Sequence, residues 1–324
     1  MNITIGFDER QGHSFYNTTT EPLKKEMIRR GYKVEVYSAF NNSNIKPFDV
    51  IVTNYMAVNT GAYKAPITVY LPHGVGLWKS GTQISIPTDF FMPSDMMRFW
   101  FESERSDKKY HVVGYPRLDS LLNKMKNRQE IRNRIIRELK LDASKPIIVY
   151  LPTFNSPGSD NNKRGTSTEL EKIDVKQIPN FVISMHGFDL SKHRIRELER
   201  RFKYSYWQPN KEDLMLSADM VVGDISGLLI ESLVLNIPII HLSRGSYDMF
   251  EMFNRGGNYG LLILGDVTTA ENLVQTIQSN LKFDKFAALR AYWKPKLIHT
   301  PQGGATKLAA DTLERLIKEK FNVK

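Results

Sequence analysis

Short apolar runs that alternate with helical stretches constrain the fold of this chain more than any other feature. Each run has the length of a strand and is rich in β-branched or aromatic residues. Between the first two runs, Leu23, Met27 and Ile28 follow a helical spacing, and Gly31 is placed to end that helix. The alternation predicts a parallel, doubly wound sheet. The runs of the first half are ITIGF at 3–7, VEVYS at 34–38, DVIVT at 49–53, ITVYL at 67–71, DFFMP at 89–93 and YHVVG at 110–114.

The second half repeats this alternation after a basic, helical stretch at 118–141. We therefore predict an N-terminal Rossmann-like domain at 1–143 and a second one at 144–303. Residues 304–324 carry one apolar stripe and are predicted to form an amphipathic helix that packs back on the body. The polar connection at 154–179 is predicted to be a mobile functional loop. The strands of the second half are predicted at 145–153, 181–185, 218–223 and 237–242, and its helices at 192–202 and 226–235.

Composition narrows the chemistry and the partners. The chain has no cysteine, which removes disulfides, thiolate zinc sites and any cysteine nucleophile. Its net charge of +10 over 324 residues favours anionic partners, such as nucleotides, nucleic acid or an acidic membrane surface. Its start does not read as a secretory leader, and no apolar run approaches a membrane span. We expect a cytoplasmic protein, which the basic segments 118–141 and 282–324 could hold on the inner face of the cell membrane or simply keep soluble.

The strongest functional signal is a polar turn, GDISG at 223–227, between a buried strand and a predicted helix. Backbone N–H groups and the Ser226 hydroxyl at such a helix start suit a phosphate at the carboxyl edge of a parallel sheet. Asp224, Ser226 and Gly227 are therefore candidates for binding a phosphate group, whereas the alternative is that Asp224 or Ser226 only caps the helix. Glu231 lies in the otherwise apolar helix, where its carboxylate could accept hydrogen bonds from a ribose diol or lie on a solvated face.

Two histidines follow predicted strands directly and precede glycines. His73 follows ITVYL, with Lys79 six residues later, and His186 follows FVISM and precedes Gly187. A histidine at a strand's end in a glycine turn is a candidate general base, although it could instead bond a loop carbonyl. One histidine from each half could face the other across an interdomain cleft. The remaining histidines lack this context and are expected to be structural or solvated: His13, His111, His193, His241 and His299.

Several common chemistries have no motif in this chain. It contains no GxxxxGK[ST] or GxGxxG sequence, no Asp-x-Asp triplet, and no residue pair with zinc-like spacing on a helix. We therefore expect neither a P-loop kinase nor an obligatory metal, and no cofactor. The run RIRELERR at 194–201 is interpreted as a charged helix face rather than a nucleic-acid reader.

Five segments, in this order and spacing, resemble those of the CDP-glycerol glycerophosphotransferases that make teichoic acids. The resemblance runs from about residue 66 to about residue 318. It implies a GT-B fold, in which two Rossmann-like, doubly wound parallel-sheet domains face each other across a cleft that holds the active site. The segments are PHGVGLWKSG at 72–81, GYPRLD at 114–119, VYLPTFN at 149–155, ISMHG at 183–187 and EDLMLSADMVVGDISGLLIESLVLNIPII at 212–240.

The resemblance implies a role for each matched residue. His73 matches the family's histidine proposed as the base on the acceptor hydroxyl, and His186 matches one near the donor pyrophosphate. Asp224 and Ser226 fall on the Asp and Ser of the family's turn, and Glu231 stands where related GT-B enzymes have a ribose-binding Glu.

The matched segments also contain weaker candidates and departures from the family pattern. Arg117 and Asp119 match its GxPRxD motif, and Thr153 stands in its PTF segment. Asn155, a further possible site residue, replaces the family's arginine after that segment, and Gly187, a donor-binding candidate, replaces a proline. The loss of the arginine removes a phosphate-pairing cation and leaves the donor's identity open.

The expected function is transfer of glycerol phosphate, or a related polyol phosphate, from a CDP-alcohol to a hydroxyl of a glycan or polyol-phosphate acceptor, with release of CMP. His73 would take the acceptor proton, while Ser226 and His186 would stabilise the developing negative charge. The expected partners are this donor and a glycan or lipid-linked acceptor, with no specific nucleic acid. The alternative is a GT-B glycosyltransferase or epimerase that uses a UDP-sugar, and a lesser one is a noncatalytic basic protein that binds anions or nucleic acid.

Overall fold

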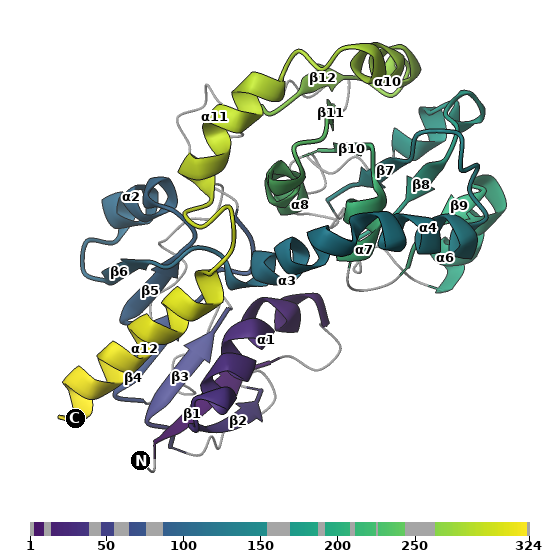
Figure 1. The fold of residues 1–324 in the computed structure, drawn as a ribbon. Helices are drawn as coiled ribbons and strands as arrows, with labels where there is room; N and C mark the ends of the chain where they lie inside the picture. The colour runs from purple at the N-terminus through teal and green to yellow at the C-terminus, as the bar shows by residue number, and fades with distance from the viewer. Residues whose placement is uncertain are drawn as a thin grey trace. The chain divides into compact units, whose positions relative to one another are not determined.

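The computed structural model describes ten stretches of the chain, and these form two compact units. One unit comprises Met1–Asn123 with Lys294–Lys324, and the other Lys124–Trp293. Figure 1 shows one parallel sheet in each of them. The described stretches are 3–9, 14–38, 47–54, 65–75, 87–153, 169–186, 192–207, 211–224, 226–243 and 263–322.

The first unit is built on a six-stranded sheet in the order β2-β1-β3-β4-β5-β6, and all of its neighbouring strands are parallel. Each strand overlaps one of the runs predicted in the first half. β3, β4 and β5 are buried along their whole length, as expected for strands covered on both faces. The bounds are β1 Thr4–Asp8, β2 Lys33–Tyr37, β3 Val50–Thr53, β4 Ile67–Tyr70, β5 Asp89–Met92 and β6 Lys109–Val112.

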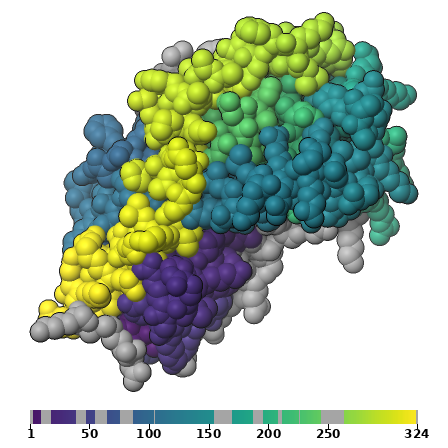
Figure 2. All heavy atoms as spheres, in the orientation of Figure 1, coloured from purple at the N-terminus to yellow at the C-terminus, as the bar shows by residue number. Residues whose placement is uncertain are grey.

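Helices cover both faces of this first sheet. On one face, Leu23 of α1 (Ser14–Arg29) and Leu313 of α12 (Ala305–Phe321) share a buried core with the strands. On the other, Phe101 of α2 (Asp95–Glu104) lies 6.2 Å from Phe90, ring centroid to ring centroid. The terminal helix predicted at 304–324 is α12, which runs beside α1 on the surface of this unit (Figure 2).

The second unit contains another six-stranded parallel sheet, in the order β12-β11-β10-β7-β8-β9. Counted from β7, this is the 3-2-1-4-5-6 order of dinucleotide-binding folds. The edge strands β9 and β12 were not predicted, because two and three residues are too few to show a strand pattern. The bounds are β7 Ile148–Leu151, β8 Phe181–Ile183, β9 Tyr204–Ser205, β10 Met220–Gly223, β11 Ile239–Leu242 and β12 Asp266–Thr268.

The helix predicted at 226–235 is shorter than expected. Only α8 is regular α-helix, and a 3-10 turn, η6 (Ser232–Leu235), follows it. The Ser232 hydroxyl donates to the Leu229 carbonyl at 2.7 Å, which competes with the regular helical bond. The remaining helix bounds are α3 Pro116–Lys124, α4 Arg128–Leu139, α6 Lys192–Arg201, α7 Glu212–Ser217, α8 Gly227–Glu231, α10 Leu273–Lys282 and α11 Ala287–Leu297.

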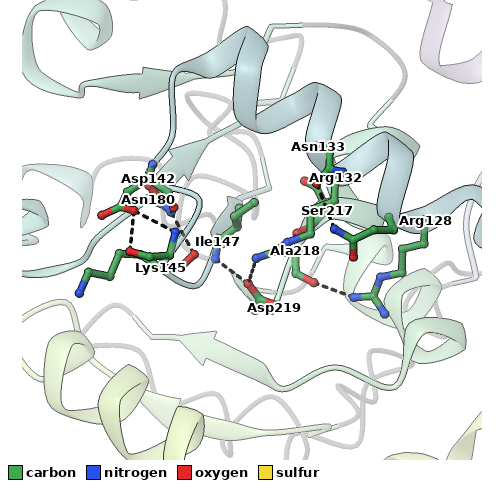
Figure 3. A network of polar contacts seen from close by, with 12 residues as sticks. Arg128, Arg132, Asn133, Asp142, Lys145, Ile147, Asn180, Ser217, Ala218 and Asp219 are labelled. Atoms are coloured by element: carbon green, nitrogen blue, oxygen red, sulfur yellow. Dashed lines mark hydrogen bonds and ion pairs between the residues drawn. The ribbon is translucent and has the colours of Figure 1, made fainter.

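The basic stretch predicted as one helix at 118–141 is divided into α3, a 3-10 turn and α4. Arg128 of α4 donates to the carbonyls of Leu216 and Ala218 at 2.9 and 3.0 Å, where α7 ends. Arg132 bonds to the Ser217 carbonyl and to the Asp219 carboxylate (Figure 3). These arginines satisfy carbonyls that a helix end leaves without partners. They therefore attach α4 to the second unit, so the contact division falls between Asn123 and Lys124 rather than after residue 143.

The described part of the connection predicted at 154–179 is packed rather than mobile. It forms two 3-10 turns, η3 (Glu169–Lys172) and η4 (Val175–Gln177). Leu170 and Ile178 are buried in the core of the second unit, which holds this part in place. Residues 154–168 lie outside the described stretches.

Candidate active site

The centre of the second sheet is a topological switch point, the place where parallel α/β sheets bind ligands. There β7 and β10 lie side by side, and Gly223 of β10 approaches β7 so closely that a Cβ would come within 2.8 Å of the Leu151 carbonyl. Thr153 follows β7 and Asp224 follows β10. The fold therefore brings together two of the predicted site residues at the carboxyl edge.

Asp224 joins the two loops at this edge. The Thr153 backbone N–H donates to both carboxylate oxygens of Asp224, at 2.9 and 3.0 Å, and the Thr153 hydroxyl donates to one of them at 2.6 Å. Asp224 is only 1% exposed. Its carboxylate is thus a positioning group that orders the switch point.

His241 holds the same turn in place through hydrogen bonds at both of its ring nitrogens. Its Nδ1 lies 3.0 Å from the Asp224 carbonyl, and its Nε2 accepts a hydrogen bond from the Leu264 N–H at 3.0 Å. Because a carbonyl can only accept, Nδ1 carries the proton and the ring is neutral. Complete burial lowers the pKa of His241 to about 4. The structural role expected for His241 agrees with these contacts.

Ser226 and Glu231 lie at the two ends of α8. The Ser226 oxygen accepts from the Leu228 N–H at 3.4 Å, so it caps this helix as the alternative interpretation proposed, while its own O–H remains a donor. Gly227 is the first residue of α8, which is too short to have the strong macrodipole of a long helix. Glu231 is only 3% exposed, so the solvated-face interpretation was wrong.

His186 lies three residues after the end of β8, the strand that neighbours β7 at the switch point. Lys211, a buried residue before α7, donates from Nζ to the carbonyls of Ser184 and Met185 at 2.9 and 2.6 Å. Burial, together with the charge of Lys211, lowers the pKa of His186 to about 4. His186 is therefore a neutral hydrogen-bonding group near pH 7, and the positive charge of Lys211 lies close to it.

His73 lies at the carboxyl edge of the first sheet, just past β4. Its Nδ1 is 3.0 Å from the carbonyl of Asn54, which follows the neighbouring strand β3. The carbonyl requires a proton on Nδ1, so a neutral His73 ring has its lone pair on Nε2. The bond to a loop carbonyl that the structural alternative predicted is present, and it also prepares Nε2 to accept a proton.

Asp119, the last residue of the GxPRxD motif, makes a structural contact with the start of α12. Its carboxylate accepts hydrogen bonds from the N–H groups of Gly304, Ala305 and Thr306 at 2.9, 3.2 and 2.7 Å, and so caps α12 from α3. Gly304 has φ 97°, in the left-handed region that favours glycine. Asp119 is therefore a helix cap in the first unit, and Arg117, in the first turn of α3, is buried.

Replacement of Asp119 by alanine is expected to lower the free energy of unfolding by about 1 to 2 kcal/mol, because three N–H groups at the start of α12 lose their acceptor. Asp119→Asn keeps one acceptor oxygen and should lose less. Chemical denaturation of both variants measures this difference. A structural cap also requires unchanged donor binding, so a variant that folds normally but no longer binds a nucleotide donor would contradict this assignment.

Lys211 was missed, because it lies in a polar stretch with no motif and its role depends on contacts distant in sequence. Lys79, Asn155 and Gly187 lie outside the described residues. The facing of His73 and His186 across a cleft stays a prediction, because each unit is described by itself. Among the described residues, no cluster of three or more His, Asp or Glu side chains could hold a metal ion.

The fold belongs to the GT-B class of two-domain α/β enzymes, as comparison with solved structures shows. The wall teichoic acid polymerase TagF matches with a TM-score of 0.70 and 16% identity, over 99% of this chain and 90% of that one. A UDP-GlcNAc 2-epimerase from Neisseria meningitidis, bound to UDP-GlcNAc, matches with a TM-score of 0.55 and 14% identity, over 97% of this chain and 100% of that one. The S. aureus MnaA–UDP structure matches with a TM-score of 0.55 and 13% identity, over 99% and 97% of the two chains.

Comparison of the sequence with family models then identifies the family. The family model for CDP-glycerol:poly(glycerophosphate) glycerophosphotransferase matches residues 87–288, which is more than half of the chain. The chain belongs to this family and is a CDP-glycerol glycerophosphotransferase-like enzyme. No curated protein matches it. The predicted family and fold class are confirmed.

Proposed function

We propose that this enzyme transfers glycerol phosphate, or a related polyol phosphate, from a CDP-alcohol to a hydroxyl of a glycan or polyol-phosphate acceptor and releases CMP. The observation that carries the proposal is the bonded pair Thr153 and Asp224 at the switch point of the second sheet, with His186 after the neighbouring strand. Parallel sheets of this order bind nucleotides at that place. The family match and the fold shared with a TagF variant soaked with CDPG favour a cytidine donor.

In the proposed reaction, the acceptor oxygen attacks the β-phosphorus of the donor while its proton passes to Nε2 of His73. A new P–O bond forms to the acceptor. The bond between the β-phosphorus and the bridging oxygen breaks, and CMP leaves with its electron pair. The backbone carbonyl of Asn54 holds the proton on Nδ1 throughout and so orients the ring for this transfer.

The donor phosphates are proposed to meet a hydrogen-bonding surface with one buried cation. The hydroxyl of Ser226 can donate to a phosphate oxygen while it caps α8. His186 offers a neutral imidazole, because its pKa is about 4. The ammonium of Lys211 is bonded to the carbonyl of Met185, the residue before His186. Glu231, buried at the end of α8, is proposed to accept hydrogen bonds from the donor ribose. Fixed dipoles and a nearby cation stabilise the charge that develops on the leaving group.

A nucleotide screen tests the donor. We expect CDP-glycerol to raise the melting temperature, because a ligand at 100 times its Kd stabilises the folded state by about 2.7 kcal/mol. CMP should appear in the mass spectrum when an acceptor is supplied. CDP-ribitol serves as a matched ligand that differs from CDP-glycerol only in its alcohol. UDP-GlcNAc differs from CDP-glycerol in its base and carries a sugar in place of the alcohol.

The second candidate function is that of a UDP-sugar enzyme. It is favoured by the whole-chain fold shared with UDP-GlcNAc 2-epimerases, including one from Methanocaldococcus jannaschii. The switch point that we assign to a cytidine donor would serve a UDP-sugar equally well. Stabilisation by UDP-GlcNAc alone, with no CMP formed from CDP-glycerol, would replace the first function by this one.

The acceptor is proposed to be a glycan or lipid-linked hydroxyl compound, and the reaction is proposed to need no cofactor besides its donor. No specific nucleic acid is proposed as a partner. An enzyme with a lipid-linked acceptor would work on the inner face of the cell membrane, and every helix in the described stretches is too short or too polar to span that membrane. Of the basic side chains in 118–141, Lys124, Arg128, Arg132 and Arg134 bond within the second unit and are not available for lipid.

A further inference from the structure

Large apolar side chains are exposed along one short segment of the second unit. Seven such side chains are exposed among the described residues, and four of them fall within residues 281–292. Figure 2 shows this segment, coloured light green, at the surface. We name these four residues, which lie at the end of α10, in the turn after it and on α11, the α10–α11 patch: Leu281 (41% exposed), Phe283 (75%), Leu289 (37%) and Tyr292 (57%).

The opposite faces of both helices hold the patch in this orientation. Leu273 and Ile277 of α10 are buried in the core of the second unit. Arg290 of α11 is only 1% exposed, donates to the Leu264 carbonyl at 3.2 Å and pairs with Asp284. Leu289 and Tyr292 lie about 100° and about 160° around α11 from Arg290, so its anchoring leaves them turned away from the buried side. The packing of both helices therefore fixes the exposure of the four patch side chains.

The patch lies in a basic setting. Residues 281–296 contain five Lys or Arg and one acidic residue, Asp284, which is already paired with Arg290. Asp266, another acid close by, pairs with Lys285 at 2.7 Å. Lys296 is exposed and lies on the same stripe of α11 as Leu289 and Tyr292, at positions i+7 and i+4. These two acids are paired with Arg290 and Lys285, and residues 281–296 by themselves, with five basic residues and one acidic residue, carry a net charge of +4.

We propose that the α10–α11 patch docks on a lipid bilayer that contains anionic lipids. Exposed leucine and aromatic side chains flanked by lysine are typical of helices that lie in the membrane interface, where the apolar groups enter the acyl boundary and the ammonium groups stay at the headgroups. Anionic headgroups complement the net positive charge. A second copy of this chain fits less well, because a symmetric contact would bring the same lysines together. The inference does not depend on the donor or on the reaction.

Vesicle sedimentation of the full chain tests the proposal. The probes are vesicles of phosphatidylcholine alone and of phosphatidylcholine with phosphatidylserine. We expect binding to the mixed vesicles that weakens with salt. Because each side chain withdrawn from the lipid forfeits burial of its apolar area, Phe283→Ser with Tyr292→Ser should reduce the partition coefficient by about tenfold or more.

Phe99→Ser is the matched control, because Phe99 is 71% exposed but lies on α2, away from the patch in sequence and on the other unit. It should bind vesicles like the unchanged protein. Absence of binding to mixed vesicles, or equal loss in the control and the patch variant, would overturn the proposal. So would a change of oligomeric state in the patch variant without a change in lipid binding, since it would assign the surface to a second copy. The melting temperature of each variant with and without CDP-glycerol shows separately whether the fold and the donor site are intact.

Discussion

Replacement of His73 by alanine is expected to lower the turnover number by about 10² to 10⁴-fold, the usual contribution of a general base. The physical reason is the bond from Nδ1 to the Asn54 carbonyl, which places the lone pair on Nε2 and leaves an alanine variant with no group to take the acceptor proton. The donor binds to the second unit in our proposal. Its dissociation constant should therefore be nearly unchanged.

Steady-state rates of CMP release and the donor-induced shift in melting temperature measure these two effects separately. His299→Ala is the matched control, because His299 is also in the first unit but is exposed. It should retain near-normal turnover. A His73→Ala variant with a normal rate would remove the proposed base, and one that fails to bind donor would place His73 in the donor site instead.

The free energy of unfolding is expected to fall as the pH is lowered from 6.5 towards 4.5. Burial lowers the pKa of His241 from 6.5 in the unfolded chain to about 4 in the folded protein. Above pH 6.5 the ring is neutral in both states, and stability does not depend on it. Below pH 6.5 the unfolded chain binds a proton that the folded protein excludes, so the loss reaches on the order of 3 kcal/mol near pH 4. The lowered pKa of His186 acts in the same direction.

Urea denaturation at pH 7 and pH 5 measures this dependence. Measurements at pH 5 and above isolate the histidines, because a carboxyl such as Glu26 costs stability only as the pH falls towards and below its ordinary pKa of 4.5; hydrogen bonds from Arg29 and Arg30 lower that pKa to about 2 in the folded protein. His241→Asn cannot titrate, so its stability should fall less steeply between these pH values, although it starts lower through the lost bond to the Leu264 N–H. Equal slopes for the variant and the unchanged protein would show that His241 is not the titrating group.

The strands and their parallel arrangement could be predicted from the sequence. The spacing of apolar residues and the residues that form turns are both signals contained in short stretches of the chain. The runs from ITIGF to IPIIHL all became strands, and both sheets are parallel. Helix ends were predicted less well, since the helix at 226–235 depends on a single side-chain bond from Ser232. The division between the two units at Lys124 was not predicted either. In the sequence Arg128 and Arg132 look like solvated charges, and only the structure shows that they donate to carbonyls at the end of α7.

The sequence by itself determined that the chain is a two-domain α/β enzyme of this family and that His73, His186 and Asp224 follow strands, since each of these rests on local pattern or motif order. Only the tertiary structure decided what those groups do. It made Asp224 a link to Thr153, 71 positions away, made Asp119 the cap of a helix 185 positions away, and placed Lys211 where its charge helps to keep His186 neutral. Burial and charge arise from residues that are far apart along the chain, and no local pattern records which of them will meet.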